Sequence, residues 1–375
     1  MIRVLSGFLY LLGTLLTLWA AAALWFDFPI AALGRALAVL YPLGIAGMLK
    51  AGRADRNTRV AWIVSLLIIV GWWFTLKPTN NRDWQRDVDR VAWADISSNA
   101  AVIHNIRNFD YVSEKSFTPR WDDRTVDISQ IRGVDIFLSH WGSPWIAHAI
   151  ASFSFADGTH LAASIEARKA EGQDYSAIRG FFRQYEILYL IAEERDVIAV
   201  RTNYRGEEVY LYHTLTTPAD AQNLFRQYLQ WMNHARLQPE WYNALTRNCV
   251  SDFVSYLARV KVGGISPWDW KVLLDGRADE MLYNLGDLAG NLPFSELKVR
   301  ALINPAARRA GQSPDFSRII RAGRPGFEPD AASSKNTAHL EIPFAMARVP
   351  QAAAYEHGTE QRLHQHSGIH IHRQP

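Results

Sequence analysis

The chain has 375 residues, of which 49% are hydrophobic and 21% are charged, and its formal net charge is +3. Its single cysteine, Cys249, excludes a disulfide framework and a zinc site built from four thiolates. The average composition hides a division: residues 1–76 are almost wholly apolar, the middle is ordinary globular sequence, and about the last 45 residues are polar. We therefore expect a membrane segment, a folded domain and a tail.

Three apolar runs, residues 5–26, 30–48 and 60–76, precede the folded domain. A helix needs about 20 apolar residues to cross a bilayer, so the first two runs suffice and the third does if it extends to Lys77. A cleaved signal peptide is the alternative for the first run, but two further spans follow closely and the run is long for such a peptide. The sequence predicts three transmembrane helices within residues 1–79.

Basic residues predict the orientation of these helices. The short loop between the second and third runs carries Lys50, Arg53, Arg56 and Arg59, and Arg3 precedes the first run. Positively charged loops stay in the cytoplasm, so the N-terminus and this loop are expected inside and everything after residue 77 outside. The prediction is a multi-pass membrane protein whose main domain lies outside the cytoplasm.

Residues 80–305 read as one domain, long enough to bury a full core. The segments expected as strands are 91–103, 106–112, 124–131, 134–139, 145–155, 159–168, 185–192, 196–202 and 208–215. Pro218 opens an amphipathic helix expected at 219–236. An antiparallel sheet followed by helices is an α+β domain. Residues 306–375 are expected to be a C-terminal extension, disordered from about residue 330 because no hydrophobic period continues there.

A hairpin is predicted around the turn Ala156-Asp157-Gly158. If these three residues form the loop, the numbers of facing residues sum to 314. One face is then apolar almost throughout, and a slip by one residue would scatter apolar and polar residues over both faces, so the pattern selects this register. The other face carries His148, Ser152 and Ser154 opposite Glu166, Ala162 and His160, with Ile150 opposite Ser164.

This register sets His148 directly opposite Glu166, within side-chain reach across the two strands. A histidine held by a carboxylate is the orienting half of a Cys-His-acid site. A cross-strand ion pair on a solvated face is an equally good interpretation, and the residues alone leave both open. We expect His160, at the mouth of the hairpin, to be exposed, and we interpret His104 as a structural residue with no nearby partner.

Cys249 is expected in the first turn of a helix. Asn248 is a good N-cap residue, and Val250, Phe253, Val254, Leu257 and Val260 recur behind it at helical spacing. The unpaired N–H groups and the dipole at a helix start favour a thiolate, which a nucleophilic cysteine requires. The alternative is that Cys249 is a small buried hydrophobic residue.

Several short motifs occur in order along residues 134–252. They are His148-Ala-Ile-Ala-Ser-Phe-Ser-Phe, Ser164-Ile165-Glu166-Ala167-Arg168, Gln184-Tyr185-Glu186, Val209-Tyr210-Leu211-Tyr212, Trp241-Tyr242-Asn243 and Thr246-Arg247-Asn248-Cys249. As a set they resemble the Lnb N-terminal periplasmic domain family. The resemblance implies a circularly permuted relative of the papain-like and NlpC-type thiol enzymes, in which the histidine strands precede the cysteine helix. It also implies site roles: Cys249 as nucleophile, His148 as base, Glu166 as orienting acid, and Asn248, Arg168 and Ser164 as their neighbours.

The resemblance further implies a membrane-anchored periplasmic thiol acyltransferase. Such an enzyme would move an acyl chain from a membrane phospholipid to the N-terminus of a lipoprotein through a thioester on Cys249. Two alternatives stay open: a papain-like cysteine peptidase or amidase acting on envelope peptides, and a non-enzymatic envelope protein. We expect no cofactor, no metal site and no nucleic-acid partner, and we interpret the histidines of the tail as solvated.

Overall fold

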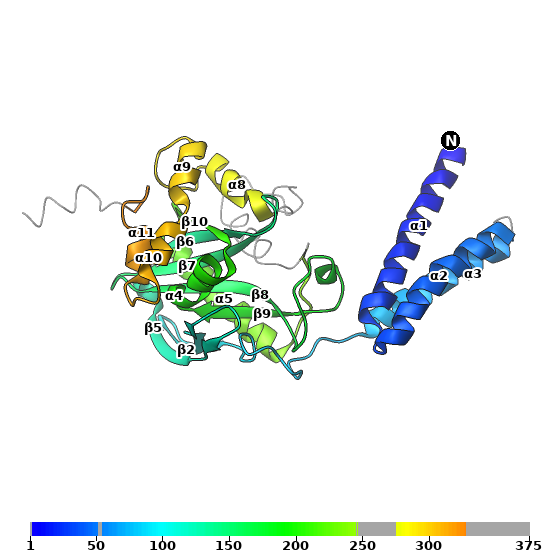
Figure 1. Ribbon diagram of the computed structural model, residues 1–375, viewed down its shortest axis with the longest axis horizontal. Helices are drawn as coiled ribbons and strands as arrows, with labels where there is room; N and C mark the ends of the chain where they lie inside the picture. Colours follow the sequence, from blue (N-terminus) through cyan, green and yellow to red (C-terminus); the bar gives the residue numbers. More distant parts are fainter. Residues whose placement is uncertain (1, 52–54, 245, 247–274, 328–375) are drawn as a thin grey trace, which may run out of the picture. The chain divides into compact units, whose positions relative to one another are not determined.

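The computed structural model describes residues 2–51, 55–244, 246 and 275–327 (Figure 1). Its first part is three helices, α1 (Ile2–Asp27), α2 (Ala31–Ala51) and α3 (Arg56–Thr75). All three are long and apolar enough to cross a membrane, in agreement with the predicted spans. Asp55 caps α3 by accepting a hydrogen bond from the Thr58 amide at 2.8 Å.

An eight-stranded sheet forms the centre of the domain that follows. Its strands are β1 (Trp93–Ile96), β2 (Ala100–Arg107), β5 (Trp121–Asp127), β6 (Ile131–His140), β7 (Ala147–Phe155), β8 (His160–Arg168), β9 (Glu186–Ala192) and β10 (Glu208–His213). The order is β1-β2-β9-β8-β7-β6-β10, with β5 also paired to β2. Pairing is antiparallel except between β2 and β9. Two short strands, β3 (Asp110–Tyr111) and β4 (Phe117–Thr118), pair with each other separately.

The predicted hairpin register is confirmed. Strands β7 and β8 pair Ile150 with Ser164 and Ser154 with His160, so the numbers of facing residues sum to 314 as expected. The Phe155 amide donates to the Thr159 carbonyl at 2.9 Å and closes the loop. Gly158 has φ +82°, which the turn requires and a side chain would strain.

The apolar face of this sheet packs against α5 (Pro218–Leu237), which matches the helix expected at 219–236. Thr217 caps its start, and Phe225 sits edge-on to Phe153 with ring centroids 4.8 Å apart. The buried Tyr228 hydroxyl donates to the carbonyls of Ser164 and Leu190 at 2.6 and 2.9 Å. The main hydrophobic core lies between this face and α5.

The opposite face packs against α4 (Glu194–Val197), the π-helix η3 (Val200–Arg205), α10 (Asn304–Ala310) and α11 (Phe316–Arg321). The strand predicted at 196–202 is therefore wrong. Residues 197–200 are a continuous apolar run, which suits a buried strand and a buried helix equally. Asp196 favours the helix, because in this conformation its buried carboxylate accepts hydrogen bonds from Arg107 at 2.9 Å and from the Phe109 amide at 2.8 Å.

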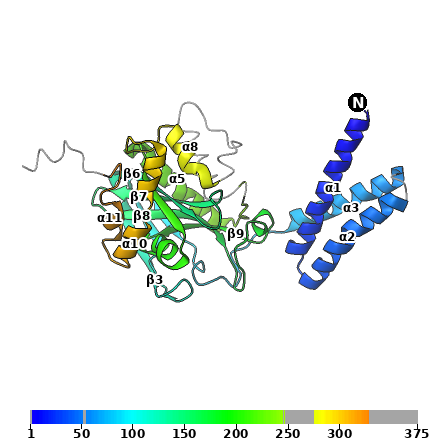
Figure 2. The ribbon, with the colours of Figure 1, turned by 45° about the horizontal axis from the view of Figure 1, so that its top comes forward.

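The remaining helices are short. They are η1 (Ile128–Gln130), η2 (Arg179–Phe181), η4 (Asp275–Arg277), α8 (Ala278–Asn284) and α9 (Phe294–Ala301). Helices α8 and α9 touch through Tyr283 and Phe294, with ring centroids 5.3 Å apart. Helices α10 and α11 lie next to each other in both views (Figure 1, Figure 2).

The predicted domain boundary at residue 305 is too early. Arg321 in α11 binds Asp135 of β6 at 2.7 Å and Glu194 of α4 at 2.6 Å, all three being buried. The domain therefore continues to at least residue 327. The tail expected to be disordered from about residue 330 lies outside the described residues.

The first predicted strand also differs, because a turn closed by Ser97 and Ala100 divides it into β1 and β2. The expectation that His104 has no nearby partner is wrong. Its Nδ1 lies 2.8 Å from an Asp123 oxygen, its Nε2 lies 3.5 Å from one of Asp95, and its ring stacks on Trp93. These partners come from β1 and β5, which both pair with β2, and only the fold brings them together.

Candidate active site

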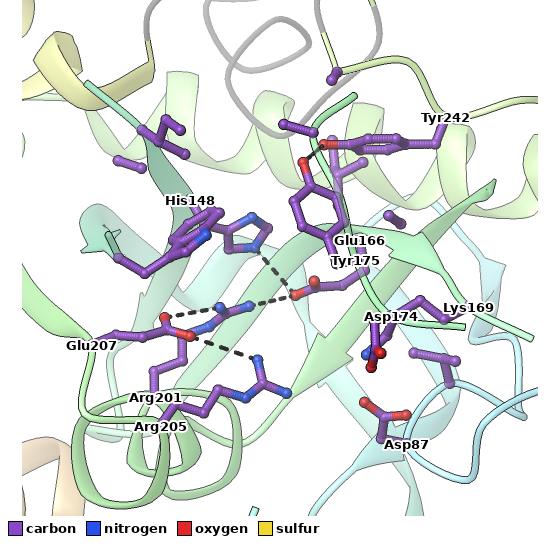
Figure 3. Close-up of a pocket in the computed structure, with 18 of the residues that line it drawn as sticks. Asp87, His148, Glu166, Lys169, Asp174, Tyr175, Arg201, Arg205, Glu207 and Tyr242 are labelled. Carbon is purple, nitrogen blue, oxygen red and sulfur yellow. Dashed lines mark hydrogen bonds and ion pairs between the residues drawn. The ribbon is translucent and has the colours of Figure 1, made fainter. Parts of the chain in front are cut away.

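His148 lies near the start of β7, opposite the end of β8, and is buried. Its Nε2 is 2.7 Å from the Ser164 hydroxyl and 3.2 Å from Oε1 of Glu166. The Ser164 hydroxyl also donates to the same Glu166 oxygen at 2.7 Å. Figure 3 shows the contact between His148 and Glu166. Residues 164 and 166 share one face of β8, so a single strand offers both partners to one imidazole nitrogen. The structure thus brings together the predicted His148, Glu166 and Ser164.

Glu166 is held as a carboxylate. Burial raises its pKa, but the charges of His148 and Arg201 and the hydrogen bonds from His148 and Ser164 outweigh burial and hold the pKa well below its ordinary value. The Arg201 guanidinium contributes an ion pair with Oε1 at 2.9 Å. An ionised Glu166 fixes the Nε2–H tautomer of His148 and leaves Nδ1 as the basic nitrogen.

Arg201 continues the chain of charges to Glu207. Its second terminal nitrogen lies 3.2 Å from a Glu207 oxygen that also accepts a hydrogen bond from Ser139. The π-helix η3 supplies Arg201, and Gly206, with φ +68°, ends that helix and turns the chain so that Glu207 points back. π-Helical turns are frequent at functional sites. The four side chains His148, Glu166, Arg201 and Glu207 are called the open cluster below.

The open cluster lines a cavity of about 530 Å³. Five aromatic side chains line it as well: Trp141, Trp145, Tyr175, Phe181 and Tyr242. Its other charged residues are Asp87, Arg107, Glu114, Lys169, Asp174 and Arg205 (Figure 3). The cavity lining therefore combines charged and aromatic side chains.

Arg168 does not line this cavity, although it follows Glu166 on the same face of β8. Its buried guanidinium donates to the carbonyls of Val88 and Asp89 at 2.9 and 2.7 Å and to the Asn80 side chain at 3.0 Å. It also lies 4.1 Å from the centre of the Trp84 ring. Arg168 therefore holds residues 80–89 onto the sheet, and its guanidinium does not take part in the site around His148.

Cys249 and Asn248 lie outside the described residues, so the approach of the Cys249 sulfur to His148 stays a prediction. The described chain lines the cavity at Ala244, whose amide donates to the Gly180 carbonyl at 2.9 Å. Cys249 follows five residues later in the sequence.

His160 is half-buried, less exposed than expected, and does not line the cavity. Its Nδ1 contacts the Gly158 carbonyl at 3.1 Å, and burial lowers its pKa. Within the part of the chain that the structure describes, no group of three or more His, Cys, Asp or Glu side chains is arranged to hold a metal ion.

Sequence reasoning missed Arg201 and Glu207. Arg201 fell within the strand predicted at 196–202, and Glu207 fell between that strand and the one predicted at 208–215. The available signal was a cluster of charges, Arg201, Arg205 and Glu207, directly after a continuous apolar run. Such a run ending in charges marks the point where a buried segment meets a polar cavity, but the sheet register is needed to identify Glu166 as their partner.

Residues 117–276 match the model of the Lnb N-terminal periplasmic domain family. This is the family that the motifs around His148 and Cys249 resemble, and the matched range contains the whole open cluster and Cys249. No curated protein and no solved structure matches the chain. The match, together with three apolar helices, identifies a membrane protein with a periplasmic domain.

Proposed function

We propose that this chain, which carries an Lnb N-terminal periplasmic domain over residues 117–276 behind three apolar helices, is a thiol acyltransferase. It would be a multi-pass protein of the bacterial inner membrane that moves an acyl chain from a phospholipid to a lipoprotein N-terminus. The observation that carries the proposal is the contact of His148 with Glu166 and Ser164 at the edge of a cavity.

In the first half-reaction, Nδ1 of His148 takes the proton of Cys249, and the thiolate attacks an ester carbonyl of the phospholipid. Glu166 stabilises the imidazolium that forms. The tetrahedral intermediate collapses with loss of the lysophospholipid alkoxide, which recovers the proton from His148. The product is a thioester on Cys249.

In the second half-reaction, the amine of the lipoprotein N-terminus attacks this thioester while His148 takes an amine proton. Collapse expels the Cys249 thiolate and leaves an amide. His148 then returns the proton to the sulfur, so the enzyme ends as it began. The start of the helix expected at Asn248 would offer backbone N–H groups to the oxyanion.

A membrane anchor suits this reaction, because a phospholipid donor stays in the bilayer and the catalytic domain has to meet it there. The papain-like relationship of the fold is part of the same proposal. It would account for a histidine on a sheet, a carboxylate on the neighbouring strand and a cysteine at the start of a later helix.

Intact-mass analysis of the full chain in phospholipid vesicles without an acceptor amine tests the proposal. We expect a mass increase of one fatty acyl group, removed by neutral hydroxylamine and absent in Cys249→Ala. The acceptor is tested by mass spectrometry of lipoprotein N-termini in cells that hold no other enzyme of this activity. Full N-acylation with Cys249→Ala would refute the thiol mechanism.

A cysteine peptidase or amidase is the second candidate, and the charged lining of the cavity favours it. Lys169, Asp174 and Asp87 are suited to a peptide that carries both charges. Such an enzyme would use the same His148 and Glu166, but its adduct on Cys249 would be peptidyl instead of fatty acyl. A non-enzymatic envelope protein would form neither adduct.

A further inference from the structure

We infer that the segment Tyr175, Ile178 and Phe181, called the rim below, inserts into the surface of the bilayer and admits a lipid acyl chain to the cavity. The inference rests on the proposed function for the nature of the lipid chain, and not for the insertion itself. It assigns to the domain a membrane-docking surface separate from its three apolar helices.

The residues directly after the rim touch the ends of the apolar helices. The Gln184 side chain donates to the Phe26 carbonyl at 2.7 Å and to Asp27 at 2.8 Å. The Phe182 ring lies 5.0 Å from that of Phe26. Asp27 is the last residue of α1, so Phe182 and Gln184 lie at the level where the membrane meets water.

Arg183 makes the second contact, with the end of α3. Its guanidinium lies 3.9 Å from the centre of the Trp73 ring and donates to the Leu76 carbonyl. Trp73 in turn donates to Asp27 at 2.7 Å. Tryptophan and arginine side chains characteristically occupy the headgroup region of a bilayer. These contacts fix the height of residues 182–184 relative to the membrane.

The rim directly precedes these residues. Its three side chains are large and aromatic or aliphatic, with Arg179 between them in the sequence. Ile178 is 63% exposed and Phe181 is 44% exposed. Ile178 is four residues from Phe182, a separation of at most about 14 Å. Large exposed apolar side chains beside a membrane anchor are the features of a surface that dips into lipid.

The same rim forms a wall of the cavity that holds His148. Tyr175 and Phe181 line that cavity, and the Tyr175 hydroxyl lies 3.4 Å from that of Tyr242 (Figure 3). Across the mouth, the loop before β7 adds Trp145 and Ile146, which are also exposed. An acyl chain leaving the bilayer at the rim would meet aromatic side chains, Tyr175 and Phe181, where it enters the cavity.

The rim is held in place. The Gly180 amide donates to the Ser176 carbonyl at 2.9 Å, and the Gly180 carbonyl accepts from the Ala244 amide at 2.9 Å. A side chain at Gly180 would come within 3.0 Å of the Ala244 Cβ, so the two segments approach as closely as a glycine allows. The rim therefore keeps its place on the cavity wall, with Tyr175 and Phe181 lining the cavity and Ile178 exposed.

Insertion is tested with a fluorophore at the rim. Because Cys249 is the only cysteine, Cys249→Ala allows one label at Ile178→Cys in the full chain in phospholipid vesicles. The matched control is Val299→Cys, 76% exposed on α9, which packs at β10, four strands away from β9. Nitroxide-bearing phospholipids should quench the label at residue 178 several-fold more than at residue 299. Equal quenching would overturn the inference.

Admission of the acyl chain is tested with Ile178→Glu, because a charge resists entry into lipid. The ratio of turnover on vesicle phospholipid to turnover on a water-soluble short-chain ester should fall about tenfold, equivalent to about 1.4 kcal/mol. Val299→Glu should leave this ratio unchanged. An unchanged ratio with Ile178→Glu would overturn the acyl route. Absence of all turnover in the unaltered chain would refute the proposed function instead, while the quenching still decides on insertion.

Discussion

Two groups of buried ion pairs lie on the same face of the sheet. The open cluster contains His148, Glu166, Arg201 and Glu207, and it borders the cavity. The closed cluster contains Asp135, Glu194 and Arg321, with His213 at its edge, and α11 covers it. Both pair an arginine with two carboxylates, and both set a histidine beside one of these carboxylates.

The difference is the cavity, which only the open cluster lines. In the closed cluster, Arg321 donates to Asp135 and to both oxygens of Glu194 at 2.6–2.8 Å, and none of the three residues lines the cavity. In the open cluster, the carboxylate between Arg201 and His148 belongs to a residue that lines the cavity. Charge pairing alone therefore does not distinguish the two clusters, and exposure does not either, because the His213 side chain is 33% exposed and that of His148 is 10% exposed. What distinguishes them is that His148 lines the cavity and His213 does not.

The largest effect is expected on activity at His148. His148→Ala removes the proposed base and should slow thioester formation by about 10²–10⁴-fold. Glu166→Gln keeps the size and a hydrogen bond of the acid and should be milder. The control is His213→Ala, which removes the histidine of the closed cluster, whose Nδ1 lies 2.7 Å from Asp135. The rate of acyl-enzyme formation is measured for both variants. If His148→Ala and His213→Ala lower this rate equally, the open cluster has no special role in the reaction.

The closed cluster should dominate stability. Arg321→Ala leaves Asp135 and Glu194 buried without their partner, which should lower the free energy of unfolding by about 3–5 kcal/mol. The control is Arg318→Ala on the same helix, whose side chain is 73% exposed and pairs with exposed Asp315. That change should leave the free energy of unfolding nearly unchanged, because an exposed ion pair contributes little. Denaturant unfolding of the full chain in detergent micelles measures both free energies of unfolding. If Arg321→Ala lowers the free energy of unfolding no more than Arg318→Ala does, the closed cluster does not dominate stability.

Lowering the pH should destabilise the protein by protonating Glu194 in the closed cluster. Burial raises the pKa of Glu194, but the charge and hydrogen bonds of Arg321, with help from His160 and Ser152, lower it from the ordinary 4.5 to about 2. The stabilisation is complete above pH 4.5 and is lost as the pH falls towards 2, amounting to about 3 kcal/mol. Glu194→Gln should reduce the slope of the free energy of unfolding against pH between about pH 4.5 and about pH 2. An unchanged slope would contradict this linkage.

Much of the open cluster could be predicted from the sequence, because a two-residue period fixes which strand residues face each other. The alternation on both sides of Gly158 sufficed to pair His148 with Glu166. The neighbouring Ser164 follows from the same register. Local pattern also predicted the three apolar helices and α5.

The rest depended on contacts between distant parts of the chain. Arg201 reaches Glu166 across 35 positions, and Arg321 reaches Asp135 across 186, so neither pair has a local signature. Arg168 shares the face of Glu166, but the segment at residues 80–89 covers its guanidinium. The strand predicted at 196–202 failed because a short apolar run does not reveal its period.

The smallest effect, and the finest test of the open cluster, is expected at Arg201, which acts through Glu166. Arg201→Gln removes one of the two charges that lower the pKa of Glu166, so that pKa should rise. Because an ionised Glu166 supports the His148 imidazolium, the acid limb of the pH–rate profile should move to higher pH. The loss at neutral pH should stay within about tenfold, since His148 still faces Glu166.

Arg201→Lys keeps the charge and should restore the acid limb, although the contact with Glu207 is lost in part because lysine is a point charge and not a fork. A purely structural role for Arg201 would lower the rate equally at all pH values and would give no such rescue. If the acid limb of the pH–rate profile does not move with Arg201→Gln, the contact with His148 is enough to keep Glu166 ionised. In that case the open cluster would end at Glu166, and Arg201 and Glu207 would belong with the structural pairs of the closed cluster.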